Sequence, residues 1–396
     1  MTASSSALSA IKDPPANAAA PQGRLTSLDL FRGATIAAMI LVNDPGNEEA
    51  AFWPLRHSQW NGWTPTDLVF PFFIFIMGVS LVFSFAARRK RGDSQLKLVR
   101  HTVQRAAAIV AIGLALNATL LIFLPVYYHS LRIPGVLQRI GVVYLIAAIL
   151  YLYAGMRVRI AAAALILLGY WALMRFVPVP GYGVPGHDVA FLHPDGNLAA
   201  YLDRLLMPGH LYEGTRDPEG LLSTLPAIVT ALAGIFTGEW LRAASSPKKK
   251  AFFMLLFGVG GLVLGKLWDP WFPINKKLWT SSYVLFSAGF ALVILAVCYW
   301  ANDVKQWRGA WTRPFLIFGM NAIAAYVIAW LMEVAEAAIT VHAAGKQLSL
   351  QEWITGHLFA SISPPALASL VFALSFVIAS FLPVWLMYRR RIFLKV

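Results

Sequence analysis

The sequence is poor in charged residues and almost lacks cysteine. Only 13% of its 396 residues are charged, whereas a soluble domain carries about 25%. A chain with so little polar surface is not expected to stay in water, so the composition argues for lipid as its solvent. The single cysteine, Cys298, lies within an apolar run, which excludes a disulfide within the chain and argues against a thiol nucleophile.

Several patterns of catalytic or binding chemistry are also missing from the sequence. It has no metal-ligand spacing of His, Cys, Asp and Glu, no glycine-rich phosphate loop and no Ser-His-Asp order, so we predict a site without metal. The net charge of +14 comes from short basic clusters beside apolar runs. Membrane orientation and anionic lipid explain such clusters, so lipid rather than nucleic acid is the expected partner.

Long apolar runs are what the sequence has in abundance. Each is about 20 residues long and would cross roughly 30 Å of hydrocarbon as a helix. Because backbone amides in lipid must be bonded internally, and because the short alternating segments of a barrel are not seen, we predict an all-α polytopic membrane protein. The spans are expected at 25–43, 67–87, 104–124, 136–154, 158–176, 221–241, 251–268, 281–300, 314–334 and 366–388, about ten in all.

The domain organisation is simple. Residues 1–23 are rich in Ala, Ser and Pro and lack the apolar region of a signal peptide, so they are interpreted as a disordered cytoplasmic tail. Residues 24–396 are interpreted as one transmembrane domain. Basic clusters follow alternate spans, which predicts that both termini are cytoplasmic.

The loops on the opposite side are longer and hold most of the Pro and His, together with many of the Trp, Tyr and Gly. They lie at 44–66, 125–135, 177–220, 269–280 and 335–365. Function concentrates on loops that a rigid scaffold positions. Loop 177–220 is too short for a domain and contains a helical stretch at Asn197–Leu206, so we interpret it as a lid.

Charged and amide side chains near or within the spans need a reason, because they are costly in lipid. Asp29 and Arg32 are three residues apart in the first predicted span, where they form either a structural ion pair or part of a site. Asn43 ends that span before Asp44-Pro45-Gly46. It is either a turn-forming residue or a catalytic amide.

His57 lies in the loop after the first span, among aromatic residues. An isolated histidine is most often structural, but an imidazole can also accept and return a proton near neutral pH. The run Thr64-Pro65-Thr66-Asp67 has the pattern of a helix start with a capping box. Asp67 therefore either caps that helix or orients His57, and the sequence leaves both interpretations open.

Further polar groups are expected on the same side as His57. They come from different predicted helices and loops, so their spacing does not show whether they compensate one another's charges or line a pocket for a polar ligand. These groups are Gln138 with Arg139, Glu219 within 217–220, Lys276 within 275–277, and Asn321.

The motifs that contain these residues resemble the heparan-alpha-glucosaminide N-acetyltransferase family, and the chain looks like a bacterial member. The resemblance extends over essentially everything after residue 24, with several motifs in the right order. They are Leu-Asp-Leu-Phe-Arg-Gly (28–33), His-Ser-Gln-Trp-Asn-Gly (57–62), Thr-Asp-Leu-Val-Phe-Pro-Phe-Phe-Ile-Phe-Ile-Met-Gly (66–78), Arg-Ile-Pro-Gly-Val-Leu-Gln-Arg (132–139), Asp-Pro-Glu-Gly (217–220), Asn-Lys-Lys-Leu-Trp (275–279) and Gly-Met-Asn (319–321).

The resemblance implies a transmembrane acyltransferase of the bacterial inner membrane. Such an enzyme takes acetyl from cytosolic acetyl-CoA and delivers it to the amine of a terminal glucosamine on the periplasmic side. The acceptor in a bacterium is expected to be an amino sugar of a wall or chitin-type glycan rather than heparan sulfate. The sequence is compatible with a homodimer and does not specify the oligomeric state.

The resemblance also implies roles for individual residues. The active histidine of the family's His-x-x-Trp-Asn-Gly motif corresponds to His57, as general base or acetyl carrier. Asn43 matches an implicated asparagine, although Asp44-Pro45-Gly46 replaces the glycine run that follows it in the family. With Asp67 these are the predicted catalytic residues. The predicted substrate-binding residues are Asp29, Arg32, Trp60, Asn61, Gln138, Arg139, Glu219, Lys276 and Asn321.

Two other functional classes remain open from the sequence. A transporter or flippase for an amino sugar or glycan precursor would also have many membrane helices with polar groups between them. A membrane scaffold would have no small-molecule site, and acetyl-CoA would not stabilise it against unfolding.

Overall fold

The computed structural model describes residues 25–307, 309–343 and 345–394. Within these ranges the protein is mostly helical, which confirms the predicted fold class, and the predicted tail at 1–23 lies outside them. The long helices are α1 (Thr26–Asn43), α2 (Val69–Lys90), α3 (Gln95–Phe123), α4 (Val136–Tyr153), α5 (Met156–Phe176), α7 (Leu221–Arg242), α8 (Pro247–Trp268), α9 (Ser281–Tyr299), α11 (Ala322–Ala338) and α13 (Pro365–Arg389).

The shorter elements lie between these helices. They are η1 (Trp53–Leu55), η2 (Pro65–Leu68), α6 (Leu198–Leu206), the π-helical turn η3 (Trp300–Val304), α10 (Thr312–Met320), the antiparallel hairpin of β1 (Thr340–Ala343) and β2 (Lys346–Ser349), and α12 (Leu350–Leu358). The helical stretch predicted at Asn197–Leu206 is therefore confirmed as α6. The Asn197 side chain caps it, since its Oδ1 accepts the backbone N–H of Ala200 at 2.9 Å.

Eight of the helices in the described ranges are long and apolar enough to cross a membrane, or nine if α10 and α11 count as one bent span. Helix α1 also forms where a span was expected but is not among the eight, because Asp29, Arg32 and Asn43 lower its hydropathy. The span predicted at 314–334 is not a single straight helix. Helices α10 and α11 meet there at 90°, with Asn321 between them.

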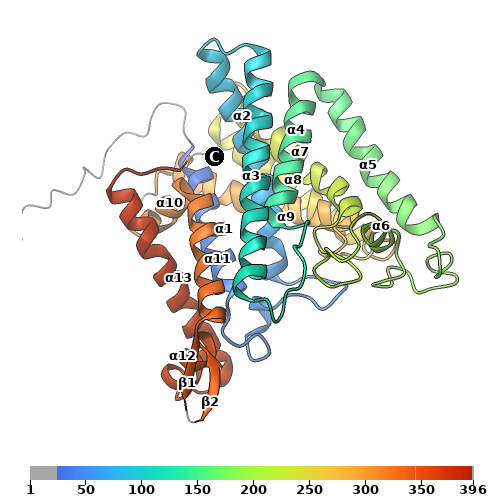
Figure 1. Ribbon diagram of the computed structural model, residues 1–396. Coiled ribbons are helices and arrows are strands. Elements are labelled where there is room, and N and C mark those ends of the chain that lie inside the picture. Colours follow the sequence, from blue (N-terminus) through green and yellow to red (C-terminus); the bar gives the residue numbers. More distant parts are fainter. Residues whose placement is uncertain (1–24, 308, 344, 395–396) are drawn as a thin grey trace, which may run out of the picture.

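Helices α2 and α7 form the centre of the larger helix group, and about two thirds of each candidate span (67%) is buried. Their backbones approach closely through glycines: a Cβ on Gly78 would lie 2.1 Å from the Ala231 carbonyl oxygen, and one on Gly234 would lie 2.1 Å from that of Phe75. Small residues permit such close helix contacts in membranes. Helices α3, α5 and α8 surround this centre and expose most of their apolar side chains, as expected of lipid-facing helices (Figure 1).

A second group contains α1, α10, α11 and α13, which pack on one another around a smaller apolar cluster (Figure 1). Helix α10 crosses α1 at a very short distance. A Cβ on Gly33 would lie 1.6 Å from the Phe315 carbonyl oxygen, and one on Gly319 would lie 2.3 Å from that of Asp29. This crossing holds α10 against the first half of α1. Helix α10 therefore runs in a different direction from α11.

The two ends of the molecule differ. The turn between α2 and α3 and the C-terminal end lie at the upper end in Figure 1, whereas loop 44–66 and the β1–β2 hairpin with α12 lie at the lower end. Loop 44–66 is tied to two other long loops: the Gly62 amide donates to the Ile274 carbonyl at 2.7 Å, and the Trp60 indole N–H donates to the Leu192 carbonyl at 2.8 Å. The loops expected on one side of the membrane therefore do assemble.

Candidate functional site

The site is built first on the start of the second span. Pro65–Leu68 forms a turn of 3₁₀-helix, and Asp67 closes its capping box by accepting the Thr64 backbone N–H on Oδ2 at 3.0 Å. The other carboxylate oxygen, Oδ1, lies 2.7 Å from Nδ1 of His57, and the Ser58 amide donates to Oδ2 at 3.0 Å. Both interpretations that the sequence left open for Asp67 therefore apply, because its carboxylate caps the helix and also bonds to the imidazole of His57.

The burial of this pair is asymmetric. The side chain of Asp67 is 1% exposed, whereas that of His57 is 41% exposed. With Nδ1 against a carboxylate, the tautomer that fits is the one in which Nδ1 donates its proton to Asp67 and Nε2, 3.5 Å from Nζ of Lys276, is left as an acceptor. This is the arrangement in which a histidine can accept a proton or act as a nucleophile.

Lys276 adds a cation to the pair from loop 269–280. Its Nζ lies 3.1 Å from His57 Nδ1 and 3.7 Å from Asp67 Oδ1. Burial lowers the pKa of the Lys276 ammonium, and the attraction of Asp67 opposes this shift. The sequence predicted Lys276 as a binding residue, and the structure brings it beside His57.

Trp60 and Asn61 of the same motif hold the surrounding loops. The Asn61 Oδ1 accepts from the Asn275 side-chain amide at 3.2 Å, next to Lys276 in the chain. The Trp60 indole reaches into loop 177–220, as described above. The predicted residues His57, Asp67, Asn61, Trp60 and Lys276 therefore form one contiguous unit, made from loop 44–66 with the helix start after it and from loop 269–280.

A group of charged residues lies between α4 and the start of α7. The Arg132 guanidinium makes two hydrogen bonds to Asp217, at 2.9 and 2.7 Å, and also pairs with Glu219. Arg139 is buried, stacks 5.0 Å above the Trp279 ring and donates to the Gly220 carbonyl at 3.2 Å. In the part of the chain that the structure describes, its Nε and Nη1 have no hydrogen-bond partner.

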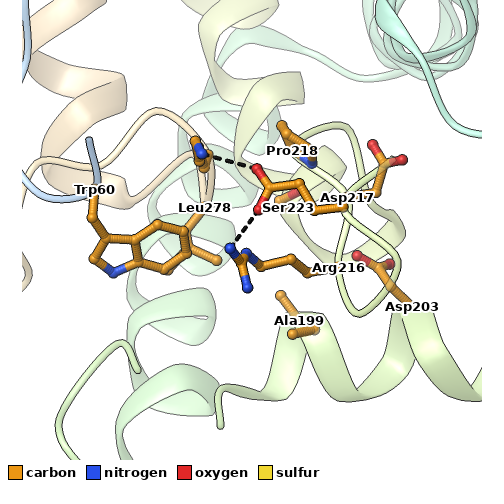
Figure 2. A pocket seen from close by; sticks show the side chains of 11 residues that line it. Trp60, Ala199, Asp203, Arg216, Asp217, Pro218, Ser223 and Leu278 are labelled. Atoms are coloured by element: carbon orange, nitrogen blue, oxygen red, sulfur yellow. Dashed lines mark hydrogen bonds and ion pairs between the residues drawn. The ribbon is translucent and has the colours of Figure 1, made fainter. Parts of the chain in front are cut away.

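A pocket opens beside Trp60, between loop 177–220 and loop 269–280. Figure 2 shows the Arg216 guanidinium beside Trp60, 5.4 Å from the centroid of its ring, with Asp203 and Asp217 on the far side of Arg216 from Trp60. Glu213 joins the two loops, since it pairs with both Lys277, at 2.8 Å, and Arg216. Burial raises the pKa of Asp203 in α6 to about 6, although the Leu221 amide donates to it.

Sequence reasoning missed the pocket residues Asp203, Glu213, Arg216 and Lys277 as a site. The only indication of such a site in the sequence was that charges of both signs lie in the loops expected on one side of the membrane. None of them lies at a spacing that indicates which partner it meets, because the partners come from loops separated by tens of residues.

Asn43 lies in a different, smaller cavity. This cavity is lined by Asn43 from the end of α1 and by Tyr326, Trp330 and Glu333 from α11, together with apolar neighbours. In the described residues no hydrogen bond joins Asn43 to His57. Sequence reasoning did not select Glu333, although a carboxylate within an apolar run was a usable signal.

The remaining predicted residues lie elsewhere. Asp29 and Arg32 form an ion pair at 3.1 Å near the start of α1, at the opposite end from Asn43. Asn321 donates to the Ile392 carbonyl at 3.0 Å and accepts from the Leu394 amide at 3.1 Å, so it holds the C-terminal segment. The Gln138 side chain occupies the space beside Gly113 and Gly135.

Comparison with known proteins adds a family relationship to this geometry. Residues 24–264 match the family model described as "Heparan-alpha-glucosaminide N-acetyltransferase, catalytic". The chain is 36% identical over 352 residues to the mouse (Mus musculus) protein named heparan-alpha-glucosaminide N-acetyltransferase. This match covers 77% of the chain and 53% of the mouse protein. It is 35% identical to the Homo sapiens protein of the same name, over 77% of this chain and 52% of the human one. The chain thus spans about half the length of these relatives.

Proposed function

Because the chain belongs to the heparan-alpha-glucosaminide N-acetyltransferase family, we propose that it is a transmembrane N-acetyltransferase. It moves acetyl from cytosolic acetyl-CoA to the amine of a glucosamine-type sugar on the other side of the membrane. The observation that carries this proposal is the His57–Asp67 pair, at 2.7 Å, with Lys276 beside it. No metal is needed for this chemistry.

The oriented imidazole supports two routes. In the direct route, Nε2 of His57 takes a proton from the acceptor ammonium, the free amine attacks the thioester carbonyl carbon, and the C–S bond breaks to release the CoA thiolate. In the two-step route, Nε2 attacks the thioester carbonyl carbon first, and the C–S bond breaks to release the CoA thiolate. The neutral amine then attacks the acetyl-imidazole, the bond between the acetyl carbon and Nε2 breaks, and the amine proton passes to the released imidazole. In both routes Asp67 stabilises the positive charge that develops on the imidazole.

The carbonyl oxygen becomes negatively charged during attack and needs a donor or a cation. Lys276 is the cation nearest to His57, at 3.1 Å, so it joins Asn43 as a candidate for stabilising this oxyanion. Nε and Nη1 of Arg139 have no hydrogen-bond partner among the described residues, so we propose them as donors to a polar part of a substrate.

The orientation in the membrane follows from the basic clusters. Arg88, Arg89 and Lys90 end α2, and Arg389 ends α13, at the opposite end from the His57 loop (Figure 1). By the positive-inside rule that end faces the cytoplasm of a bacterium, so both termini are cytoplasmic and His57 faces the periplasm. Loop 177–220, which contacts Trp60, then acts as a lid on the periplasmic side of the single domain 24–396.

The test is acetyl transfer from labelled acetyl-CoA to glucosamine by the purified protein. His57→Ala should lower the rate by about 100-fold or more, the usual contribution of a general base. The matched control is His187→Ala, which removes an exposed histidine of loop 177–220. Labelled protein trapped without acceptor would indicate the two-step route.

The rival hypothesis has a distinct outcome. A transporter or flippase would move glucosamine or a glycan precursor across vesicles even in the His57→Ala variant. Equal acetyl transfer by the wild type and this variant would remove His57 from the mechanism, and no transfer by the wild type would contradict the enzyme proposal.

A further inference from the structure

The second span begins with a missing hydrogen-bond donor. In an α-helix the backbone N–H of each residue donates to the carbonyl four residues earlier. Residue 71 is a proline, which has no N–H, so the Asp67 carbonyl receives no such bond. Asp67 is buried, and a buried carbonyl needs another donor, because an unpaired polar group there is costly.

A tyrosine from another helix supplies this donor. The hydroxyl of Tyr283, on the first turn of α9, donates to the Asp67 carbonyl. The Tyr283 side chain is fully buried, and its ring packs edge-on against that of Trp279, with the ring centroids 5.3 Å apart. The bond therefore joins the start of the second span to the start of α9 in the interior of the protein.

This bond differs from those of the Asp67 carboxylate. The carboxylate oxygens contact the imidazole of His57 and accept the backbone N–H groups of Ser58 and Thr64. All three partners belong to the loop before the helix, which can shift as a unit and take the carboxylate with it. Tyr283 instead ties the Asp67 backbone to a different membrane helix, so it fixes this loop relative to the rest of the bundle.

The chain segment that carries Tyr283 also carries Lys276. Lys276 lies seven residues before Tyr283, and the backbone N–H of Trp279 between them donates to the Lys276 carbonyl at 3.1 Å. Trp279 has a φ of 52°, a left-handed conformation that is costly for a bulky residue and that persists only where its surroundings enforce it. Its buried indole N–H donates to the Thr230 hydroxyl on α7 at 3.2 Å. Lys276 and Tyr283 are therefore held in a fixed relation to each other.

We propose that Tyr283 is a positioning residue of the candidate site. Its hydroxyl fixes Asp67, and through Asp67 the imidazole of His57, at a set distance from Lys276. Nδ1 of His57 lies 2.7 Å from Oδ1 of Asp67 and 3.1 Å from Nζ of Lys276. A carboxylate that holds one ring nitrogen raises the basicity of the other, so an imidazole held in this way is the better proton acceptor and nucleophile. The inference rests on the proposed function and names a residue that acts in it without touching the substrate.

The first experiment removes only the hydroxyl. Tyr283→Phe keeps the buried ring and leaves the Asp67 carbonyl without this donor. In the assay of acetyl transfer from acetyl-CoA to glucosamine, kcat should fall about 10- to 100-fold, the usual effect of losing a partner that orients a functional side chain. KM for glucosamine should stay within a few-fold of the wild type, because Tyr283 does not contact the substrate.

Ser281→Ala is the matched control on the same helix. The hydroxyl of Ser281 is also buried and also donates to a backbone carbonyl, that of Leu167 on α5, at 2.7 Å. Each variant loses one buried hydrogen bond, so the melting temperatures of both should fall by similar amounts. Only Tyr283→Phe should lose kcat, whereas Ser281→Ala should stay within a few-fold of the wild type. Equal kcat in the two variants would leave Tyr283 a structural residue and overturn the proposal.

A second substitution can return the missing donor. Pro71→Ala gives residue 71 a backbone N–H, which can donate to the Asp67 carbonyl. The double variant of Tyr283→Phe with Pro71→Ala should therefore recover kcat to within a few-fold of the wild type, and Pro71→Ala alone should change kcat little. A double variant as slow as Tyr283→Phe would contradict a role through this carbonyl. The double variant gives the same answer if Tyr283→Phe alone fails to fold.

Modification of His57 by diethyl pyrocarbonate separates this inference from the proposed function. The reagent reacts with the unprotonated imidazole, and mass spectrometry of the His57 peptide gives the rate without acetyl-CoA. This rate should be several-fold lower in Tyr283→Phe than in the wild type or Ser281→Ala, and Pro71→Ala should restore it. That pattern without any acetyl transfer would contradict the function and leave the positioning role standing. Acetyl transfer with unchanged kcat and an unchanged modification rate in Tyr283→Phe would contradict the positioning role and leave the function standing.

Discussion

Nδ1 of His57 lies 2.7 Å from Oδ1 of Asp67, ten residues further along the chain. The other oxygen of this carboxylate accepts the backbone N–H groups of Ser58 and Thr64, each at 3.0 Å. One buried side chain therefore starts the second membrane helix and orients the histidine at its mouth. The position of the imidazole is set by the same contacts that fold the loop.

The Asp67→Asn variant tests the orienting role. Asn retains the size of Asp67 but replaces an acceptor oxygen with a donor, so the Nδ1 proton of His57 loses its partner. We expect kcat for acetyl transfer to fall by about 10- to 1,000-fold and the free energy of unfolding to fall by about 1 kcal/mol, because the cap is weakened. Kinetics and thermal denaturation measure the two effects.

Thr64→Ala is the matched control for that variant. It removes the Thr64 hydroxyl, which bonds to Asp67 Oδ2 at 3.1 Å and to the Arg56 carbonyl, but leaves the carboxylate beside His57. Thermal stability should fall while kcat stays within a few-fold of the wild type. If Asp67→Asn behaved like Thr64→Ala, Asp67 would be a helix cap and nothing more.

Asp203 predicts a pH dependence of stability. Burial raises its pKa from 3.8 to about 6, so the folded state holds this proton more tightly than the unfolded state. The contribution to stability is fully present below pH 3.8, is lost as the pH rises toward 6 and stays lost above it. Asp203→Asn should remove this loss and raise the free energy of unfolding at pH 7 by about 1–3 kcal/mol.

Asp195→Asn provides the opposite sign in the same loop. The hydroxyl of Thr215 and the guanidinium of Arg216 lower the pKa of Asp195, so its contribution is present at neutral pH and lost as the pH falls. This variant should be less stable than the wild type at pH 7 and should match it in acid. Melting temperatures measured across the pH range check both carboxylates, and parallel curves for Asp203→Asn and the wild type would contradict the first prediction.

The close contact of α2 with α7 predicts a severe effect of a larger side chain at Gly78. A Cβ at this position would lie 2.1 Å from the Ala231 carbonyl oxygen, which is backbone and cannot move aside cheaply. Gly78→Leu should lower the free energy of unfolding by about 2–5 kcal/mol and reduce the yield of folded protein. Gly260→Leu on α8 is the control, because nothing lies within 4 Å of a Cβ there. Equal melting temperatures of the Gly78→Leu and Gly260→Leu variants would contradict the close contact between α2 and α7.

Asn321 is expected to be structural rather than substrate-binding. Its side-chain amide makes two hydrogen bonds to the C-terminal segment, at 3.0 and 3.1 Å, beside the bend between α10 and α11. Asn321→Ala should cost about 1–3 kcal/mol, make the C-terminal segment more sensitive to protease and leave KM for glucosamine unchanged. A selective rise in KM with unchanged stability would return Asn321 to the substrate site.

The features predicted correctly from the sequence are those with a local cause. An apolar run of about 20 residues forms a helix in lipid whatever its neighbours are, and Asn197 caps α6 with its own side chain. The capping box of Thr64 and Asp67 could be predicted from the sequence because its two residues are three positions apart. By contrast, the bend at Asn321 depends on α10 crossing α1 at Gly33, and nothing within 314–334 indicates it.

The candidate site divides in the same way. The sequence by itself determined that lipid is the solvent, that the chain is helical and that His57 and Asp67 stand within one short loop and the helix start after it. Only the tertiary structure brings Lys276 beside this pair, pairs Arg132 with Asp217 and Glu219, and places Glu333 and Asn43 on the wall of one small cavity. The physical reason is that periodicity and capping act over a few residues, whereas charges on different helices meet through packing that no local pattern records.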